Sequence, residues 1–283
     1  MKTILVLTDF SARADHAAQY AMQIASKAKA KILLYNSFFV PQVIPAVTTI
    51  YPYYEDYAVI EKENLLQLKK KAEGLKKKFS EENAGAPPEI QIKNDPGNIA
   101  ENVHELAKLK KFWMIIMGDK SQEGTFSRFI FGSDTHTLIE EAVCPVLLIP
   151  EKIKPKPLKK IAYATDLEQS EHKSMSFLKE LSDIWGSEIL VIHVLSNDLT
   201  AEEKVRNYDS YKQIISRIKF LKISYTDVRS DDIAMALEKF TKKETVDILA
   251  ILHKKRSFIG KVLHKSISKE MLNYHHVPIL VLP

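Results

Sequence analysis

The stretch Lys2-Thr-Ile-Leu-Val-Leu-Thr-Asp9 has a near copy, Lys159-Lys-Ile-Ala-Tyr-Ala-Thr-Asp166, which restarts the same pattern in the second half of the chain. Each half also closes on a similar apolar stretch, Cys144-Pro-Val-Leu-Leu-Ile-Pro150 and Val277-Pro-Ile-Leu-Val-Leu-Pro283. A length of 283 residues suits two domains of ordinary size. The sequence therefore predicts one domain over 1–150, a Pro- and Lys-rich linker over 151–157 and a second domain over 158–283.

Short apolar runs alternate with longer amphipathic ones in both halves. In the first half we expect strands over 3–8, 31–36, 89–93, 112–117 and 145–149, and helices over 12–28, 57–82, 98–110 and 133–142. The second half repeats the order, with strands near 160–165, 188–194, 220–226, 246–252 and 279–282. The run 113–117 is apolar at every position, which is typical of strands covered on both faces. The predicted fold class is α/β, with two repeated open parallel sheets and helices on both faces.

The composition excludes several classes of protein. Hydrophobic residues make up 45% and charged residues 27%, which is typical of a globular chain and not of a disordered one. Cys144 is the single cysteine, so an intrachain disulfide is excluded. The apolar stretch at the N-terminus meets Asp9 and Arg13 too early for a signal peptide or a membrane span. We therefore expect a soluble, cytoplasmic protein with no membrane partner.

The charge pattern indicates solvated helix faces. The net charge is only +5, and the Lys-rich runs over 69–71 and 76–78 alternate with acidic residues at helical spacing. We expect no nucleic-acid partner on this basis.

Ligands of open parallel sheets bind beyond the carboxyl ends of the strands, where the strand order reverses. The first predicted strand is followed by Thr8-Asp9-Phe10-Ser11, and the fourth by Gly118-Asp-Lys-Ser-Gln-Glu-Gly124. Gly132-Ser133-Asp134 opens the next helix. Glycines allow backbone N–H groups close to an anion, and a helix N-terminus attracts one, so this pattern favours a phosphate site. The alternative for Asp9 and for Gly132-Ser133 is a helix cap and a turn.

These segments together resemble the universal stress protein family. The resemblance is carried by Thr8-Asp9-Phe10-Ser11, Met117-Gly118, Gly132-Ser133 and the stretch from Cys144, and it extends to both halves, as in a tandem universal stress protein. It implies an adenine nucleotide alpha hydrolase-like fold. In nucleotide-binding members, Gly, two residues, Gly, nine residues and Gly-Ser or Gly-Thr hold the phosphates of ATP. Here Ser121 replaces the middle glycine, and the spacing is one residue longer.

The resemblance implies ATP or another adenine nucleotide as the cofactor, with Mg²⁺ left open. It places Thr8 and Asp9 beside the adenosine, Asn36 near the base, and Gly118, Gly132 and Ser133 around the phosphates. The full set of candidate residues is Thr8, Asp9, Asn36, Met117, Gly118, Ser121, Gly124, Gly132, Ser133 and Asp134.

The second half keeps Thr165 and Asp166, but its phosphate loop is degenerate. We expect His253 to stand in the place of Gly118, and Lys265-Ser266 in the place of Gly132-Ser133. Side chains at glycine positions crowd a backbone cradle, so we expect this half not to bind ATP in the family manner. The alternative is a different anion held by the basic side chains of 254–265.

Three functions remain open. The first is a stress-response regulatory protein that binds an adenine nucleotide in the first domain, while the second domain serves pairing or docking on a protein partner. The others are a slow ATP hydrolase or phosphotransferase, with Lys120 and Mg²⁺ as candidates for charge stabilisation, and a nucleotide-free interaction module. No catalytic residue or metal ligand is assigned. The apolar final strands, 146–149 and 279–282, predict an intrachain pseudo-dimer, and a homodimer is left open.

Overall fold

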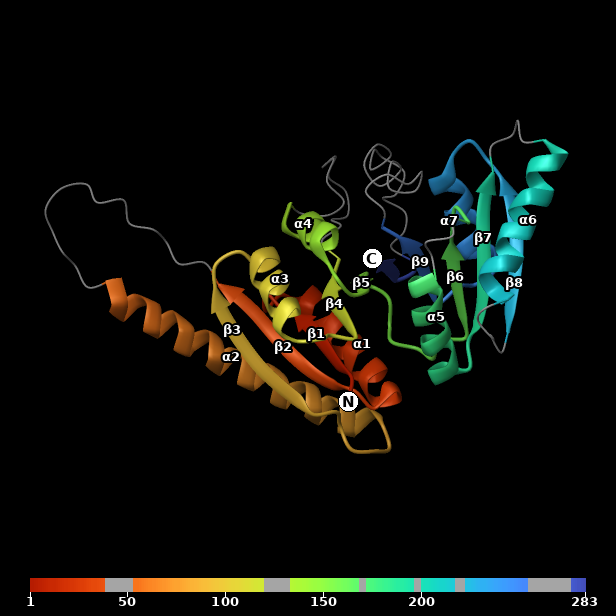
Figure 1. The fold of residues 1–283 in the computed structure, drawn as a ribbon. Coiled ribbons are helices and arrows are strands. Elements are labelled where there is room, and N and C mark those ends of the chain that lie inside the picture. The colour runs from red at the N-terminus through yellow and green to blue at the C-terminus, as the bar shows by residue number, and fades with distance from the viewer. Residues whose placement is uncertain (39–52, 120–132, 168–171, 196–199, 217–221, 254–275) are drawn as a thin grey trace, which may run out of the picture. The chain divides into compact units, whose positions relative to one another are not determined.

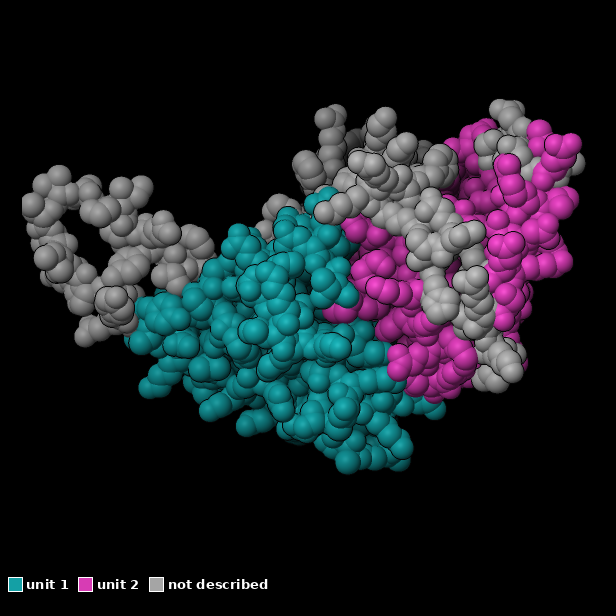
Figure 2. Space-filling view, viewed as in Figure 1, with its two compact units in different colours: residues 1–118, 133–143 teal, residues 119–132, 144–283 magenta. Residues whose placement is uncertain are grey.

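The computed structural model describes residues 1–38, 53–119, 133–167, 172–195, 200–216, 222–253 and 276–283. The chain forms two compact units. Unit 1 comprises residues 1–118 and 133–143, and unit 2 comprises residues 119–132 and 144–283 (Figure 2).

Unit 1 alternates strands and helices along the chain (Figure 1). Its elements are β1 (Thr3–Leu7), α1 (Ala12–Ala28), β2 (Lys31–Phe38), α2 (Tyr53–Glu82), β3 (Ile90–Pro96), α3 (Ile99–Leu109), β4 (Met114–Gly118) and α4 (Ser133–Glu141). The strands lie in the order β3-β2-β1-β4 and are parallel. Because strand-to-strand crossovers are right-handed, α1 and α2 cover one face of this sheet, and α3 and α4 cover the other.

The core of unit 1 lies between β1, β4 and α1. Residues 4–7 and 114–116 are buried, as the continuous apolar runs predict for central parallel strands. The buried face of α1 consists largely of alanines, including Ala14, Ala17 and Ala21, and these small side chains let the helix lie close to the sheet. Ser11 caps the start of α1 by accepting a hydrogen bond from the Ala14 N–H.

Unit 2 repeats the alternation and adds one strand from the first half of the sequence. Its elements are β5 (Val146–Ile149), β6 (Lys160–Ala164), α5 (His172–Trp185), β7 (Glu188–Leu195), α6 (Ala201–Ser216), β8 (Ile223–Arg229), α7 (Ile233–Lys243), β9 (Ile248–Leu252) and β10 (Ile279–Leu282). The strands lie in the order β5-β10-β9-β6-β7-β8.

The final strands of the two halves pair with each other, whereas the intrachain pseudo-dimer stays a prediction. β5 runs antiparallel to β10, and Leu147 stands opposite Leu280. The pairs β10–β9, β9–β6, β6–β7 and β7–β8 are parallel. The wholly parallel arrangement expected from the sequence is therefore broken where β5 meets β10.

The segment before β6 is fixed to the start of β9 by one buried carboxylate. Asp247 accepts hydrogen bonds from the backbone N–H groups of Lys159 and Lys160, at 2.7 and 2.9 Å, and forms a 2.6 Å ion pair with Lys156. The predicted linker is thus attached to unit 2 by specific contacts at its end. The domain boundaries themselves stay a prediction.

The predicted α/β fold class is confirmed, and the boundaries of single elements differ by a few residues. β3 continues to Pro96, three residues beyond the expected end, and its extension is supported by a 3.0 Å hydrogen bond from Tyr35 to Asp95. Within the described residues, no helix combines the length and the apolar character that crossing a membrane requires.

Candidate functional site

The strand order of unit 1 reverses between β1 and β4. The chain leaves β1 toward β2 and β3, and then returns to place β4 on the other side of β1 (Figure 1). The carboxyl ends of these two strands, at Leu7 and Gly118, are therefore the position where open α/β sheets bind ligands.

The turn after β1 is organised by the hydroxyl group of Thr8. Its Oγ1 accepts a 3.0 Å hydrogen bond from the N–H of Phe10, which adopts a φ of 62°. Asp9 is exposed, and its Oδ1 accepts hydrogen bonds from the N–H and the hydroxyl group of Ser11. Ser11 is the helix cap, so the alternative of Asp9 as the N-cap of α1 is wrong. Asp9 instead orients the capping residue.

Asn36 lies beside this turn, on β2. It is only 5% exposed, and its Nδ2 donates a 2.8 Å hydrogen bond to the carbonyl oxygen of Thr8. Its Oδ1 is buried and has no hydrogen-bond partner among the described residues. On β3, Asn94 stands in register with Asn36 and donates to the carbonyl oxygen of Glu61 on α2.

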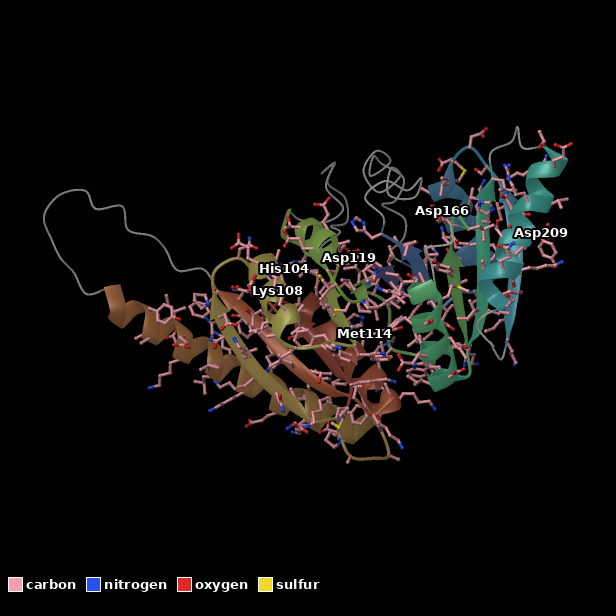
Figure 3. All side chains as sticks on the ribbon, in the orientation of Figure 1. His104, Lys108, Met114, Asp119, Asp166 and Asp209 are labelled. Atoms are coloured by element: carbon pink, nitrogen blue, oxygen red, sulfur yellow. The ribbon has the colours of Figure 1, made fainter. Side chains whose placement is uncertain are left out.

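Gly118 ends β4 against the backbone of α1. A Cβ atom at this position would lie 2.9 Å from the carbonyl carbon and oxygen of Arg13. This close approach alone requires a glycine, whether or not a phosphate binds there. Met117 before it is half-buried. After it, Asp119 (Figure 3) donates its backbone N–H to the carbonyl oxygen of Ile149, at 2.9 Å.

The structure thus brings Thr8 and Asn36 into contact and places Gly118 at the end of the strand beside β1. Ser133 and Asp134 form the start of α4, as the sequence predicts. Ser121, Gly124 and Gly132 lie outside the described residues.

Unit 2 repeats the turn after its first strand. Thr165 Oγ1 accepts a 2.8 Å hydrogen bond from the N–H of Leu167, whose φ is 60°. Asp166 follows β6 (Figure 3) as Asp9 follows β1. The Thr-Asp repeat in the sequence is therefore a repeat of one backbone turn.

One expected equivalence between the halves is wrong by one residue. Ile4 pairs with Met114 in unit 1, and its counterpart Ile161 pairs with Ile248 in unit 2. Counting along β4 and β9 from these pairs, Leu252 corresponds to Gly118, and His253 corresponds to Asp119. His253 also donates its backbone N–H to Leu282, as Asp119 does to Ile149. Leu252 is buried, so a large apolar side chain fills the glycine position.

The same registers place an ionisable pair where unit 1 has two asparagines. His193 takes the position of Asn36, and Asp227, in register with His193, takes the position of Asn94. The His193 Nδ1 lies 3.6 Å from Asp227 Oδ1, which also accepts a 2.5 Å hydrogen bond from the hydroxyl group of Tyr225. Burial lowers the pKa of His193, and the nearby carboxylates of Asp227 and Asp166 oppose this effect.

A small hollow lies at this edge of unit 2. It is lined by Ala164, Thr165, Asp166, Ile192, His193, Val194, Ile233 and Leu237.

The sequence analysis missed His193 and Asp227. An alignment of the second strand of each half places His193 at the position of Asn36. This comparison could have identified both residues from the sequence. In the part of the chain that the structure describes, no group of three His, Cys, Asp or Glu residues could hold a metal ion.

Comparisons with known proteins agree with this architecture. The model of the universal stress protein family matches residues 1–150. No curated protein matches the chain by sequence. A universal stress protein from Archaeoglobus fulgidus DSM 4304 has 15% identity and a TM-score of 0.68, covering 99% of this chain and 95% of its own.

Two further solved structures are similar over almost the whole chain. A putative universal stress protein from Pseudomonas aeruginosa UCBPP-PA14 has 14% identity and a TM-score of 0.59, covering 100% of this chain and 93% of its own. The cytoplasmic domain of a prokaryotic cation chloride cotransporter has 12% identity and a TM-score of 0.53, covering 99% and 94%. At such identities the likeness shows the fold alone.

Proposed function

Because the chain belongs to the universal stress protein family, we propose that unit 1 binds ATP or another adenine nucleotide and that the bound state controls docking on a protein partner in a stress response. The observation that carries the proposal is the reversal of strand order between β1 and β4. The Thr8-Asp9 turn and the end of β4 meet there, and this is where nucleotides bind in open α/β sheets.

In the proposed site, each region of the ligand has its own residues. Thr8 and Asp9 face the adenosine, and Asn36 lies near the base. Gly118, Gly132 and Ser133 surround the phosphates, where the first N–H groups of α4 have no acceptor within the helix. Met117, Ser121, Gly124 and Asp134 complete the set. Mg²⁺ would be bound through the phosphates, and any Mg²⁺ dependence is part of the test.

Unit 2 does not take the nucleotide in this manner. Leu252 occupies the position of Gly118, and the His193–Asp227 pair replaces the two asparagines. We assign this half to pairing, through β5 and β10, and to partner docking. The expected stoichiometry is therefore one nucleotide per chain.

Mass spectrometry of ligand released from the freshly purified full chain tests the proposal without a prior choice of nucleotide. We expect an adenine nucleotide. Calorimetric titration with ATP should then show one site. Two equivalent sites would contradict the assignment of unit 2, and measurable turnover would favour the slow hydrolase over a purely regulatory role.

Substitution of Gly132 tests the phosphate loop. Gly132→Val places a branched side chain at the proposed phosphate contact and should weaken binding by more than tenfold, about 1.4 kcal/mol. Asp9→Ala should also weaken it, whereas Gly260→Ala in the second half should leave it unchanged. Thermal melting accompanies each titration, because a glycine can be required for backbone reasons alone. Normal affinity in a folded Gly132→Val protein would favour the nucleotide-free interaction module.

A further inference from the structure

Helix α2 is longer than the part of the sheet that it covers. It has 30 residues, about 45 Å, whereas β3, against which it packs, has 7 residues, about 23 Å. Its counterpart in unit 2, α6, has 16 residues in the described chain. Figure 1 shows the N-terminal end of α2 projecting past the carboxyl ends of β2 and β3. The N-terminal part of α2 therefore extends beyond what covering the sheet requires.

The C-terminal half of α2 carries its packing within unit 1. The buried side chains of the helix are Leu68, Ala72 and Phe79, and Lys71 forms an ion pair with Asp15 of α1. By contrast, every residue over 57–67 is at least partly exposed. This part of the helix keeps one side open to solvent.

Two of the exposed residues on this side are apolar. Val59 is 54% exposed and Leu66 is 53% exposed. They stand seven residues apart, about two helical turns, so they lie on one stripe of the helix. Lys62 and Glu63 lie between them and are also exposed. We call these four residues the α2 strip.

The α2 strip is complementary to itself in an antiparallel arrangement. About a twofold axis midway between Lys62 and Glu63, Val59 faces Leu66 of the partner subunit, and Lys62 faces the partner subunit's Glu63. The symmetry repeats both contacts, which gives two apolar contacts and two pairs of opposite charge. A parallel pair in register would instead bring each of these charges, and the lysine run 69–71, against its own copy, which like-charge repulsion opposes.

We propose that two copies of the chain associate through the α2 strip, as an antiparallel pair of helices. Apolar side chains repeated every seven residues are the spacing at which paired helices interlock. The contact covers only about two turns of each helix, less than a standard interface of about 1,200–2,000 Å². The dimer is therefore reversible, and its population increases with protein concentration. This inference does not rest on the nucleotide site, because the α2 strip contains none of the residues proposed for it.

Sedimentation equilibrium of the full chain without nucleotide, over about 10–500 µM, tests the proposal. We expect a monomer–dimer equilibrium. Leu66→Lys removes an apolar contact and should weaken the dimer by at least about tenfold. Leu109→Lys is the matched control, because it makes the same change at a leucine of α3 that is 82% exposed. It should leave the dimer unchanged. Circular dichroism of each variant verifies that the fold is retained.

A charge reversal tests the antiparallel register. Lys62→Glu places two carboxylates opposite each other at both symmetry-related contacts and should weaken the dimer severalfold. The double variant Lys62→Glu/Glu63→Lys restores opposite charges across the twofold axis and should recover the wild-type affinity. Adjacent residues of one helix do not face each other, so this recovery reports on the contact between two copies.

Each contrary result has a separate meaning. A chain that stays monomeric up to about 500 µM would overturn the proposal and leave the α2 strip to a different protein. A dimer that neither Leu66→Lys nor Lys62→Glu weakens would belong to another surface, which also overturns the proposal. If the double variant does not recover the affinity lost in Lys62→Glu, the antiparallel register is wrong.

Discussion

At the scale of single residues, the Thr-Asp pair that follows the first strand of each half could be recognised from the sequence as a repeated feature. The structure adds the physical reason for the threonine. Thr8 and Thr165 each accept the N–H of the residue two positions later, and that residue has a left-handed backbone. Gly118 was interpreted from the sequence as a phosphate contact. The close approach of the Arg13 backbone already requires a glycine at this position.

Gly118→Ala should destabilise unit 1. The new methyl group would lie 2.9 Å from the carbonyl group of Arg13, and overpacking of this kind costs about 1–3 kcal/mol. Chemical denaturation measures the change. Gly74→Ala is the matched control, because Gly74 lies within α2 and its added methyl group meets nothing within 4 Å beyond the backbone of its own helix. It should stabilise the protein by about 0.5–1 kcal/mol. Equal stability of both variants would refute the close approach.

At the scale of elements, strands and helices were predictable because the period of apolar residues follows directly from the backbone geometry. The pairing of residues between strands was not. Placing His253 at the position of Gly118 was wrong by one residue, since the chain alone does not show which residue of β9 lies beside Ile161. The ionisable pair on β7 and β8 was not predicted for the same reason. His193 and Asp227 become neighbours only through the register in which these two strands pair.

His193 should make stability depend on pH. Burial lowers its pKa in the folded protein, and its side chain is only 12% exposed. As pH falls below about 6.5, the unfolded chain takes up the proton first, so the free energy of unfolding decreases until the folded histidine is also protonated.

Denaturation of the wild type and of His193→Asn, between about pH 7.5 and about pH 5.5, measures this effect. The variant carries the residue that unit 1 has at this register, and it should lose less stability on acidification. Asp227, Asp166 and Tyr225 remain in both proteins, so the difference reports on the imidazole. Identical pH profiles would contradict the assignment.

Asp247 should be a major stabilising residue of unit 2. Asp247→Ala leaves the N–H groups of Lys159 and Lys160 without their carboxylate acceptor, which should cost about 3 kcal/mol. Lys156→Ala is the control, because this lysine is 46% exposed and a pair open to solvent contributes less than about 1 kcal/mol. Urea denaturation compares the two variants. A larger loss from Lys156→Ala would assign the stabilisation to the ion pair.

At the scale of the whole molecule, the pairing of β5 with β10 was predictable from their composition. All eight of their residues are buried, and an apolar strand left at a sheet edge promotes aggregation. The internal sequence repeat likewise predicted the repeated order of elements. What the repeat could not show is that β5, although it belongs to the first half of the sequence, forms part of unit 2.

Fragments 1–157 and 158–283 should each be poorly soluble or self-associate when expressed alone, because each exposes one of the paired strands. Coexpression should restore a complex of one copy of each. Size-exclusion chromatography with light scattering measures both results. Two well-behaved monomers would refute the dependence of each half on the other.

The pairing of β5 with β10 also has a consequence for biosynthesis. Leu148 leaves the ribosome long before its partner Ile279 has been translated. During that interval the nascent chain carries an apolar strand whose hydrogen-bonding edge is open, the kind of surface that chaperones protect. Because the pair closes a loop of more than a hundred residues, we expect its formation to be a late and slow step of folding. Ribosomes that stall or terminate before β10 would release a polypeptide prone to aggregation, even though most of its secondary structure is already encoded.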